Sequence, residues 1–393
     1  MESSNAKSRG GNTMKIVFLH HANVCRGGVE RMLCTKANLL AEQDDFEVVM
    51  LTYEQNDAPY PYSLSSKVKC IDLRVRLYSA YRYGYPVRYF MKRYLRYQLS
   101  SSLKRFLTQH HPDVIVCTDK DANELNALSR VCTNEILLIE AHTGIVDHRM
   151  QVYRTTNVFR KIIAKRDMRK LQRAVSKYDL LIALTKDDAD CWNSFVKTVV
   201  VPNYFSTLTD MLADLTIEKK RVISVGRLDY QKGQDLLLQA WASVESKHPD
   251  WQLVIFGDGT EKSSLNTQIA HLNLRNVTIH PTVTDIYSEY MQSDFLVCSS
   301  RWESFGLIII EAMSCGIPVV AFDCDNGPRN IVKNDIDGLL AQNGNVDDLA
   351  AKMNKMIDNS SLRQEMGLRA RQNVERFRDE YVFKQYLELY RQL

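Results

Sequence analysis

The sequence predicts an α/β protein of two domains, each built on a parallel β-sheet. The chain has 393 residues, 45% of them hydrophobic and 25% charged, and this length suits two hydrophobic cores because domains cluster near roughly 100–200 residues. From Met14 onward, short apolar runs rich in β-branched residues alternate with helical stretches. That alternation is typical of βαβ units, whose strands pair in parallel.

Two series of strands are expected. The first series comprises residues 15–20, 46–52, 67–73, 113–118, 135–141, 179–185 and 197–202. The second series comprises residues 221–228, 251–257, 276–281, 294–300 and 317–323. Successive runs are separated by segments that suit a helix, so each series predicts one sheet with covering helices.

The joint between the two series is expected near Pro202. Proline fixes one backbone dihedral and lacks an amide donor, and a polar, weakly patterned stretch follows it up to Lys220. We therefore predict a first domain over residues 14–202 and a second over residues 203–368. Residues 1–13 lack the apolar core of a signal peptide and are expected to form a disordered leader.

Composition narrows the possible functions. Lys and Arg number 51 against 47 Asp and Glu, and a net charge of +4 is too small to indicate nucleic-acid binding by itself. The nine cysteines include no C-x-x-C pair, which favours reduced, mostly buried thiols over a disulfide framework or a zinc site. No run of 18 apolar residues is present, so no membrane-spanning segment is expected. These features favour a cytoplasmic protein.

Two glutamates with seven residues between them, Glu303 and Glu311, follow the expected strand at 294–300. Ser304 stands in a cap-like position and Gly306 permits close approach of the backbone, so we expect a helix to begin near Phe305. This arrangement places Glu303 at the mouth of the helix and Glu311 in its second turn.

The start of this expected helix suits a phosphate group. The backbone N–H groups of Phe305, Gly306 and Leu307 would be unsatisfied donors there, and the helix dipole also favours negative charge. The Glu303 carboxylate would face the reacting end of a ligand, and the Glu311 carboxylate would reach further along it. The stretch therefore indicates a site for a nucleotide sugar.

The same stretch resembles the signature of the family 4 retaining glycosyltransferases, which have the GT-B fold. That signature is E-x7-E followed by A-x-x-x-G-x-P-V-V. In this chain it reads Glu303, Glu311, Ala312, Gly316, Pro318, Val319 and Val320. The resemblance implies two Rossmann-like domains facing each other across a cleft, the first taking the acceptor and the second the nucleotide sugar. It also implies C-terminal helices, expected over residues 369–393, that cross back onto the first domain.

Two segments of the first domain match the family as well. Gly27 and Gly28 open the helix after the first strand, and paired glycines let backbone amides approach a ligand closely. The resemblance implies that this loop lies over the donor phosphates and the acceptor cleft. His142 ends the fifth strand, at the edge where parallel sheets form a ligand crevice, and it matches the family's cleft histidine, which contacts the donor sugar near its reacting carbon.

In the second domain, Arg227 and Lys232 belong to a G-R-L-x-x-x-K-G segment at the end of the first strand. They would place two cations beside the diphosphate, where the leaving group gains negative charge. Val283 occupies the position at which the family lets the nucleobase sit against main-chain groups. His280 to Thr282 stand where the family commonly has glycine, which leaves recognition of the base open.

Two other ligand classes are less well supported. Asp323 and Asp325 formally match a D-x-D metal motif, and carboxylates at this spacing can hold a divalent cation. Because Arg227, Lys232 and the helix dipole already supply positive charge, we expect no metal and no other cofactor. Neither domain has G-x-G-x-x-G after its first strand, which argues against a dinucleotide-dependent dehydrogenase.

Basic and aromatic residues gather in the first domain. Residues 74–105 hold nine Lys or Arg, eight Tyr or Phe and no Asp or Glu, and Arg88, Lys92 and Arg96 form one stripe of an expected helix. A second basic stretch covers residues 149–177. No nucleic-acid-binding motif accompanies them. An acidic membrane surface, a lipid-diphosphate acceptor and a merely solvated basic face each explain these patches.

The sequence thus predicts a retaining glycosyltransferase that moves a hexosyl unit from a UDP-sugar to a growing glycan, expected to be lipid-linked. Lys232 and Arg227 would neutralise the diphosphate. Glu311 would hold the ribose hydroxyls, and Glu303 with His142 would orient the sugar. Two alternatives stay open. One is a soluble enzyme that makes a storage glucan, disaccharide or small glycoside, and the other is a nucleotide-sugar-binding scaffold without catalysis.

Two finer expectations follow from the same comparison. The segments at 283–286, 323–324 and 327–328 resemble a subgroup that transfers galactose-type or N-acetylhexosamine sugars during bacterial glycan assembly. The protein is expected in the cytoplasm. Its basic patches are compatible with peripheral contact at the inner face of the cell membrane.

Overall fold

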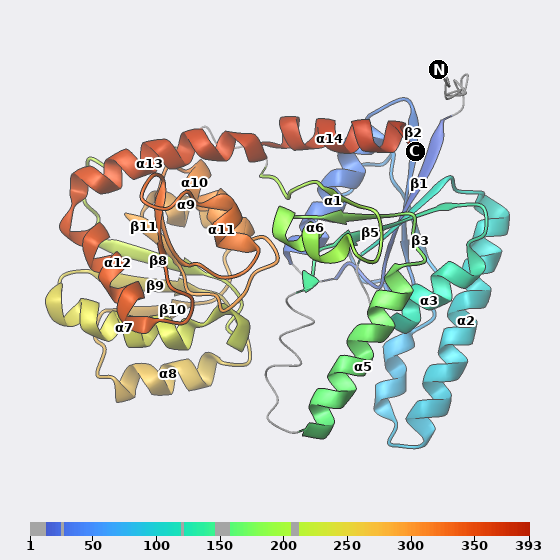
Figure 1. Cartoon of the computed structure of the whole chain (residues 1–393), viewed down its shortest axis with the longest axis horizontal. Helices are drawn as coiled ribbons and strands as arrows, with labels where there is room; N and C mark the ends of the chain where they lie inside the picture. The colour runs from blue at the N-terminus through green and yellow to red at the C-terminus, as the bar shows by residue number, and fades with distance from the viewer. Residues whose placement is uncertain (1–12, 25–26, 119–121, 146–157, 206–211) are drawn as a thin grey trace.

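The computed structural model describes residues 13–24, 27–118, 122–145, 158–205 and 212–393. They form two α/β domains that lie beside each other (Figure 1). Each domain contains one sheet in which all strand pairs are parallel. The predicted fold class, two parallel-sheet domains of α/β type, is confirmed.

The first sheet has seven strands in the order β3-β2-β1-β4-β5-β6-β7. Their bounds are β1 Met14–His20, β2 Phe46–Thr52, β3 Lys69–Asp72, β4 Val114–Thr118, β5 Ile136–Ala141, β6 Leu180–Ala183 and β7 Thr198–Val200. All seven correspond to the first expected series. Every residue of the central strands β4 and β6 is buried, as expected for a parallel sheet covered by helices on both faces.

Helices cover this sheet and extend beyond it (Figure 1). Their bounds are α1 Gly28–Ala41, the 3₁₀ helix η1 Leu77–Arg82, α2 Val87–His110, α3 Ala122–Val131, α5 Val158–Val175 and α6 Lys186–Trp192. Helix α3 packs against both α2 and α5. The N-terminal ends of α2 and α5 protrude from the same side of the domain in Figure 1.

The second sheet has six strands in the order β10-β9-β8-β11-β12-β13. Their bounds are β8 Arg221–Val225, β9 Gln252–Phe256, β10 Val277–His280, β11 Phe295–Cys298, β12 Val319–Phe322 and β13 Gly338–Ala341. The five expected strands are present, and β13 is an addition that the sequence pattern does not predict. It is a four-residue edge strand without a β-branched residue, so its strand character comes from pairing with β12.

The helices of the second domain surround this sheet. Their bounds are η2 Tyr230–Lys232, α7 Gln234–Lys247, α8 Lys262–His271, α9 Ile286–Met291, α10 Leu307–Ser314, α11 Gly327–Ile331, α12 Val346–Asp358 and α13 Ser360–Val374. Two more elements, η3 Glu375–Phe377 and α14 Asp379–Arg391, end the chain. Within the described part of the chain, every helix is too short or too polar to span a bilayer.

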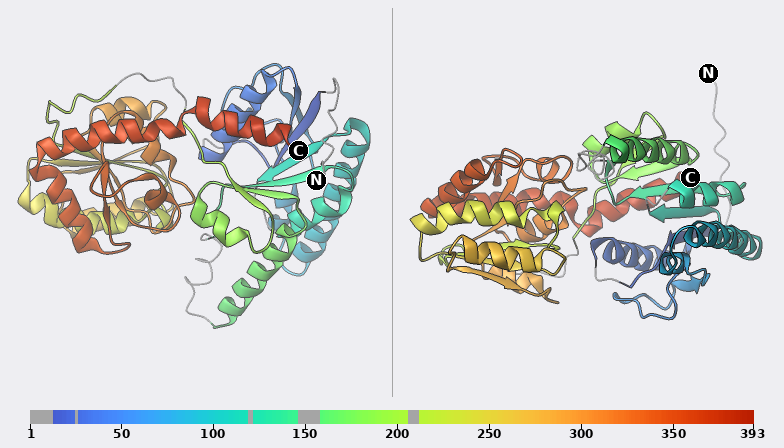
Figure 2. Two further views of the ribbon diagram at one scale, coloured as in Figure 1. Left: turned by 45° about the horizontal axis from the view of Figure 1, so that its top comes forward. Right: turned by 90° about the horizontal axis from the view of Figure 1, so that it is seen from below.

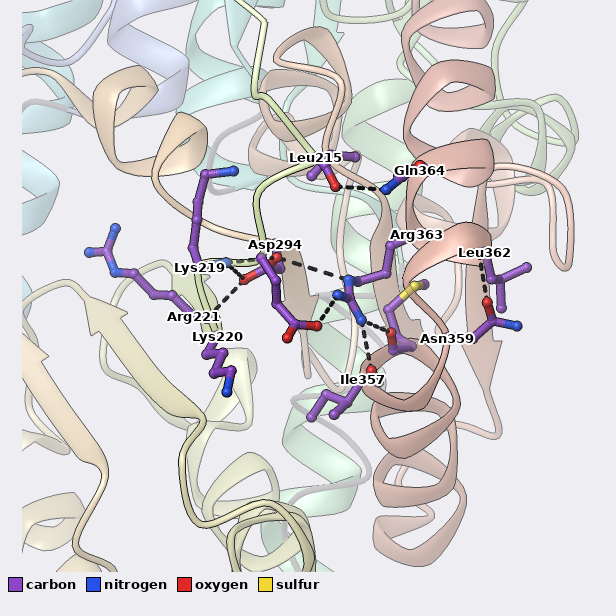
Figure 3. Close-up of polar contacts among 12 residues, drawn as sticks. Leu215, Lys219, Lys220, Arg221, Asp294, Ile357, Asn359, Leu362, Arg363 and Gln364 are labelled. Atoms are coloured by element: carbon purple, nitrogen blue, oxygen red, sulfur yellow. Dashed lines mark hydrogen bonds and ion pairs between the residues drawn. The ribbon is translucent and has the colours of Figure 1, made fainter.

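A buried arginine fixes α13 to the second domain (Figure 3). Arg363 is 2% exposed and donates to the carbonyl oxygens of Met356 and Ile357 at the end of α12. Its guanidinium also pairs with Glu218 at 2.5 Å. Because several acceptors satisfy it, this buried charge orders the helix corner rather than destabilising it.

The last helix, α14, carries the chain back to the first domain (Figures 1 and 2). Helix α13 packs against α10 and α12 of the second domain, whereas α14 packs against α1 of the first. Tyr386 and Tyr390 of α14 are buried in the core that lies between α1 and the first sheet. Among the described C-terminal helices, α14 is the one that packs on the first domain, so the return to that domain begins near residue 378, later than the predicted residue 369.

Candidate active site

Several of the predicted site residues come from segments that meet between the two domains. The N–H of Gly144, two residues beyond His142, donates to the Ser304 hydroxyl of the second domain at 3.0 Å. Gly28, at the start of α1, faces Leu307, at the start of α10: a Cβ on Gly28 would lie 2.8 Å from the Leu307 side chain. The glycine therefore permits this close approach of the two helix starts.

The start of α10 differs from the expectation. The helix begins at Leu307, not near Phe305, and its N-cap is Gly306, with φ at +103°. This left-handed conformation suits glycine and separates Ser304 and Phe305 from the helix. Ser304 is therefore not the cap, because its hydroxyl accepts from Gly144 instead. Glu311 lies in the second turn, as predicted, and Glu303 lies in the loop before the helix.

Lys232 and Glu303 form an ion pair at the domain interface. The Lys232 ammonium lies 2.6 Å from Glu303 Oε1, which also accepts from the Ser300 hydroxyl at 2.7 Å. Burial acts to lower the pKa of Lys232, but the Glu303 carboxylate outweighs it and raises the pKa. The lysine is therefore charged at neutral pH. It provides a preorganised cation at the end of η2, seven residues beyond the end of β8.

Glu311 is paired with an arginine of the first domain. The carboxylate is 4% exposed, its Oε1 accepts from the Arg31 guanidinium of α1, and the Tyr290 hydroxyl lies 3.4 Å from Oε2. The Glu311 charge raises the pKa of Arg31 above its ordinary value. The carboxylate predicted to hold a ribose thus joins the two domains in this structure, and a ligand hydroxyl would have to compete with Arg31 for it.

His142 belongs to a buried polar chain inside the first domain. Its Nε2 lies 3.1 Å from Glu140 Oε2, and the other oxygen of Glu140 accepts from Lys36 at 2.5 Å. Glu140 and Lys36 are each 1% exposed. Burial acts to raise the pKa of Glu140, but Lys36 and His142 outweigh it and lower the pKa to about 2. Because an ionised carboxylate only accepts, the His142 Nε2 carries a proton and the ring orientation is fixed.

Helix α14 completes this buried chain. The Tyr390 hydroxyl lies 3.5 Å from Glu140 Oε1, and the Lys36 ammonium sits over the Tyr386 ring at 3.9 Å from its centroid. A cation over an aromatic face is stabilised by the ring quadrupole, more so when desolvated. The crossing helix therefore supports the carboxylate that holds His142.

Arg227 and Val283 lie less centrally. The Arg227 side chain is 71% exposed and contacts Asp229 and Gln231, each at 3.3 Å. It lies at the end of β8, as predicted, but in this structure it does not reach the Lys232–Glu303 pair. Val283 is half-buried against the core between the second sheet and α10. Their roles in binding a donor stay predictions.

The D-x-D segment is paired with an arginine. Asp323 Oδ1 lies 2.9 Å and Asp325 Oδ1 3.2 Å from the Arg329 guanidinium. Among the described residues, no group of three or more His, Cys, Asp or Glu side chains could hold a metal ion. The Asp323 and Asp325 carboxylates are thus already neutralised by a protein cation.

The basic stripe of α2 is only partly exposed. Arg88 is exposed, but Lys92 and Arg96 are half-buried. The Lys92 ammonium sits 4.0 Å from the centroid of the Tyr81 ring, and Arg88 lies over the same ring at 5.6 Å. These contacts tie the stripe to η1. Its predicted contact with an acceptor or membrane stays a prediction.

Sequence reasoning missed four polar residues: Arg31 and Asn326 near the domain interface, and Lys36 and Glu140 inside the first domain. Lys36 lies three residues after Leu33 and four before Leu40, on the buried stripe of α1, and that position was the available signal. Asn326 is 1% exposed with φ at +71°, and its Nδ2 has no partner among the described residues. A buried unpaired donor in a strained backbone is typical of a ligand site.

Solved structures show which class of protein this fold defines. Sucrose-phosphate synthase from Thermosynechococcus elongatus superposes with a TM-score of 0.78 at 20% identity and covers 96% of this chain and 98% of its own. Anabaena HepE, solved with UDP and glucose, superposes with a TM-score of 0.70 at 20% identity and covers 97% and 100%. The fold is that of the GT-B glycosyltransferases.

Sequence comparison agrees with the fold. Residues 213–373 match the model of the family described as Glycosyl transferases group 1. An uncharacterized glycosyltransferase of Haemophilus influenzae is 25% identical over 92% of this chain and 95% of its own length. The resemblance to these glycosyltransferases is thereby confirmed.

A further relative is named for its substrate. It is the Campylobacter jejuni enzyme named GalNAc-alpha-(1->4)-GalNAc-alpha-(1->3)-diNAcBac-PP-undecaprenol alpha-1,4-N-acetyl-D-galactosaminyltransferase. It is 23% identical to this chain over 96% of the chain and 98% of its own length.

Proposed function

We propose that the protein is a retaining glycosyltransferase that moves a galactose- or N-acetylhexosamine-type unit from a UDP-sugar to a growing, lipid-linked glycan. The observation that carries the proposal is the charged Lys232–Glu303 pair at the domain interface of a group 1 glycosyltransferase. The Campylobacter jejuni relative, which acts on an undecaprenol-diphosphate glycan, supports the acceptor. The UDP complex of the HepE structure supports the nucleotide.

The proposed chemistry assigns each side chain one task. The oxygen of the acceptor hydroxyl bonds to the anomeric carbon as the bond from that carbon to the UDP oxygen breaks. The electron pair of the broken bond goes to the diphosphate, which gains negative charge as it leaves and then takes up the hydroxyl proton. Lys232 stabilises that charge, with the backbone amides at the start of α10 as further donors. Glu303 holds the lysine in place and accepts from a sugar hydroxyl, while His142, fixed through Nε2 by Glu140, orients the sugar near its reacting carbon.

A screen of nucleotide sugars tests the proposal. We expect one UDP-hexose or UDP-N-acetylhexosamine to be hydrolysed slowly alone and transferred faster when a lipid-linked glycan is added. NMR of the product gives the anomeric configuration, which should match that of the donor. Transfer to a free sugar or small alcohol, but not to a lipid-linked glycan, would favour the soluble alternative. Binding without hydrolysis or transfer would favour a scaffold.

UDP is expected to raise the melting temperature of the protein, and Glu311→Ala is expected to reduce that rise. A ligand that binds only the native state stabilises it by about 2.7 kcal/mol at a hundredfold excess over its dissociation constant. Differential scanning fluorimetry with and without UDP measures the effect. Glu365→Ala, which removes an exposed carboxylate on α13, is the matched control. Equal protection of the Glu311 and Glu365 variants would show that Glu311 does not hold the nucleotide.

Transfer is expected to continue in excess EDTA. Lys232 and the start of α10 supply positive charge to the diphosphate, and Arg329 already neutralises Asp323 and Asp325. The check is an activity assay after chelation and dialysis, followed by addition of magnesium or manganese. Loss of turnover that either cation restores would reassign the two aspartates as metal ligands.

The two proposed substrates suggest where the enzyme would act. The proposed place is the cytoplasm, with peripheral contact at the inner face of the cell membrane, because the UDP-sugar and the lipid-linked glycan must reach the same site. Fractionation of cells by salt and alkali washes tests this proposal. Release by high salt without detergent is the expected outcome for an electrostatically held peripheral protein.

A further inference from the structure

The N-terminal part of α5 projects from the first domain. Met168 is half-buried against the core of that domain, whereas residues 158–163 are all exposed. Helix α5 therefore extends about 15 Å beyond Met168, at 1.5 Å per residue. Figure 1 shows it reaching past the body of the domain. An isolated helix of this length is marginal in water, so a second contact would stabilise it.

Four apolar side chains form the end of this helix and are defined here as the α5 tip: Val158, Phe159, Ile162 and Ile163. They are 67%, 78%, 58% and 57% exposed. Their spacing of i, i+1, i+4 and i+5 places them on one side of the helix. A contiguous exposed apolar patch of this kind marks an interaction site rather than a normal surface.

Basic residues continue the same side of α5 toward the domain. Arg166, Arg169 and Arg173, defined here as the basic collar, are exposed. At about 100° per residue they fall within the same helix face as the tip. None of the three forms an ion pair with a described residue. The tip spans about 8 Å along the axis and the collar begins about 5 Å further on. That order matches the acyl boundary and the phosphate level of a bilayer.

A second exposed patch points the same way. On α2, Phe90, Tyr94 and Tyr97 are 65%, 55% and 73% exposed, on the side opposite the buried Leu95 and Leu99. The N-terminal ends of α2 and α5 protrude from the same side of the domain in Figure 1. Tyrosine and phenylalanine beside basic residues suit the membrane–water interface, where an apolar body meets polar headgroups.

We propose that the α5 tip inserts into the surface of an anionic bilayer, with the basic collar on the lipid phosphates and the aromatic face of α2 beside it. The proposal rests on the lipid-linked acceptor proposed above, since docking would hold the cleft near such an acceptor. The positive charge of α5 and α2 favours an anionic bilayer as the partner. Helix α5 has seven Lys or Arg and one Asp, and α2 has six Lys or Arg and no acidic residue. Two copies of so basic a surface would repel each other.

Co-sedimentation with vesicles tests the proposal on the full chain. The vesicles contain phosphatidylglycerol and phosphatidylcholine, or phosphatidylcholine alone. We expect binding to the anionic vesicles that weakens as salt increases. Phe159→Ser, Ile162→Ser and Ile163→Ser combined should lower the partition coefficient by roughly a hundredfold, because three inserted side chains are lost. Arg166→Gln, Arg169→Gln and Arg173→Gln combined should lower it about tenfold or more and flatten its salt dependence.

A matched control comes from the second domain. Ile336→Ser with Leu368→Ser removes two apolar side chains that are 45% and 68% exposed, and it should leave vesicle binding unchanged. The α5 variants should keep the wild-type melting temperature and donor hydrolysis, because residues 158–163 bury nothing in the domain. An α5 tip variant that binds anionic vesicles as the wild type does would overturn the proposal.

Two other results separate this proposal from the proposed function. A wild-type protein that binds vesicles through the tip but hydrolyses no nucleotide sugar would leave docking supported and the enzymatic proposal wrong. The other result combines two measurements. If the protein does not bind vesicles, and sedimentation velocity shows a dimer that is lost only in the tip variant, the surface binds a second copy of the chain. That result would overturn the lipid assignment.

Discussion

Lys232→Ala is expected to lower the rate of transfer by roughly a hundredfold. Removing one preorganised electrostatic group that acts on developing charge typically costs about 3 kcal/mol of transition-state stabilisation. Lys232 is well placed for this task because Glu303 holds it at 2.6 Å at a strand end between the domains. The measurement is kcat with a saturating donor, since the interaction strengthens as the diphosphate leaves.

The controls for this variant distinguish chemistry from stability. Lys247→Ala removes a lysine that is 58% exposed on α7 and paired with Asp358, and it should leave turnover unchanged. Arg227→Ala should lower transfer by more than about tenfold if the exposed guanidinium moves onto the bound diphosphate. Near-normal turnover in both the Lys232 and Arg227 variants, with intact melting curves, would show that the diphosphate site lies elsewhere.

The strands were the most predictable part of the fold. Runs such as Phe46–Thr52 are apolar, β-branched and bounded by polar residues, so local pattern and burial agree. The edge strand Gly338–Ala341 was not predictable because its four residues have no strand preference of their own and depend on β12 for pairing. Its existence is a property of the sheet rather than of its own sequence.

The site was predictable where a motif lies within one segment. The Glu303 and Glu311 spacing, the end of β8 and the glycines at the start of α1 could all be placed from local sequence. Arg31 and Lys36 could not, because their partners Glu311 and Glu140 lie far along the chain. Sequence alone predicts that a charged residue on a helix is exposed to solvent. Its buried partner is known only from the tertiary structure. The role of Ser304 was unpredictable for the same reason, because its hydroxyl accepts from the N–H of Gly144 in the other domain.

The second large effect concerns the buried pair of Lys36 and Glu140. Glu140→Ala is expected to destabilise the protein by about 3–5 kcal/mol, because it leaves the Lys36 ammonium buried without its counter-charge. Tyr386 contacts the same ammonium from α14, so the crossing helix should loosen as well. Denaturant unfolding followed by tryptophan fluorescence measures the loss, and hydrogen exchange of α14 localises it. Glu388→Ala, at an exposed position on α14, is the matched control.

The pH dependence of this effect has a definite sign. The folded state lowers the pKa of Glu140 to about 2, below its ordinary value near 4.3. A group with a depressed folded pKa contributes stability at neutral pH, and the contribution is lost as pH falls from about 4.3 toward 2. The difference in unfolding free energy between the wild type and Glu140→Gln should therefore shrink across that window. A difference that stays constant between pH 6 and pH 3 would contradict the assignment of Glu140 as ionised.

A double variant separates the structural role of Glu140 from its effect on His142. Lys36→Met with Glu140→Leu replaces the ion pair by apolar side chains of similar size, and such a replacement is often neutral or stabilising in a buried site. We therefore expect its stability to return close to that of the wild type, while His142 loses the acceptor for its Nε2 proton. Transfer should stay low, with kcat reduced more than the donor KM is changed, because the imidazole is no longer held in one orientation. If the double variant recovers both stability and kcat, Glu140 serves only to neutralise Lys36, and His142 does not depend on it.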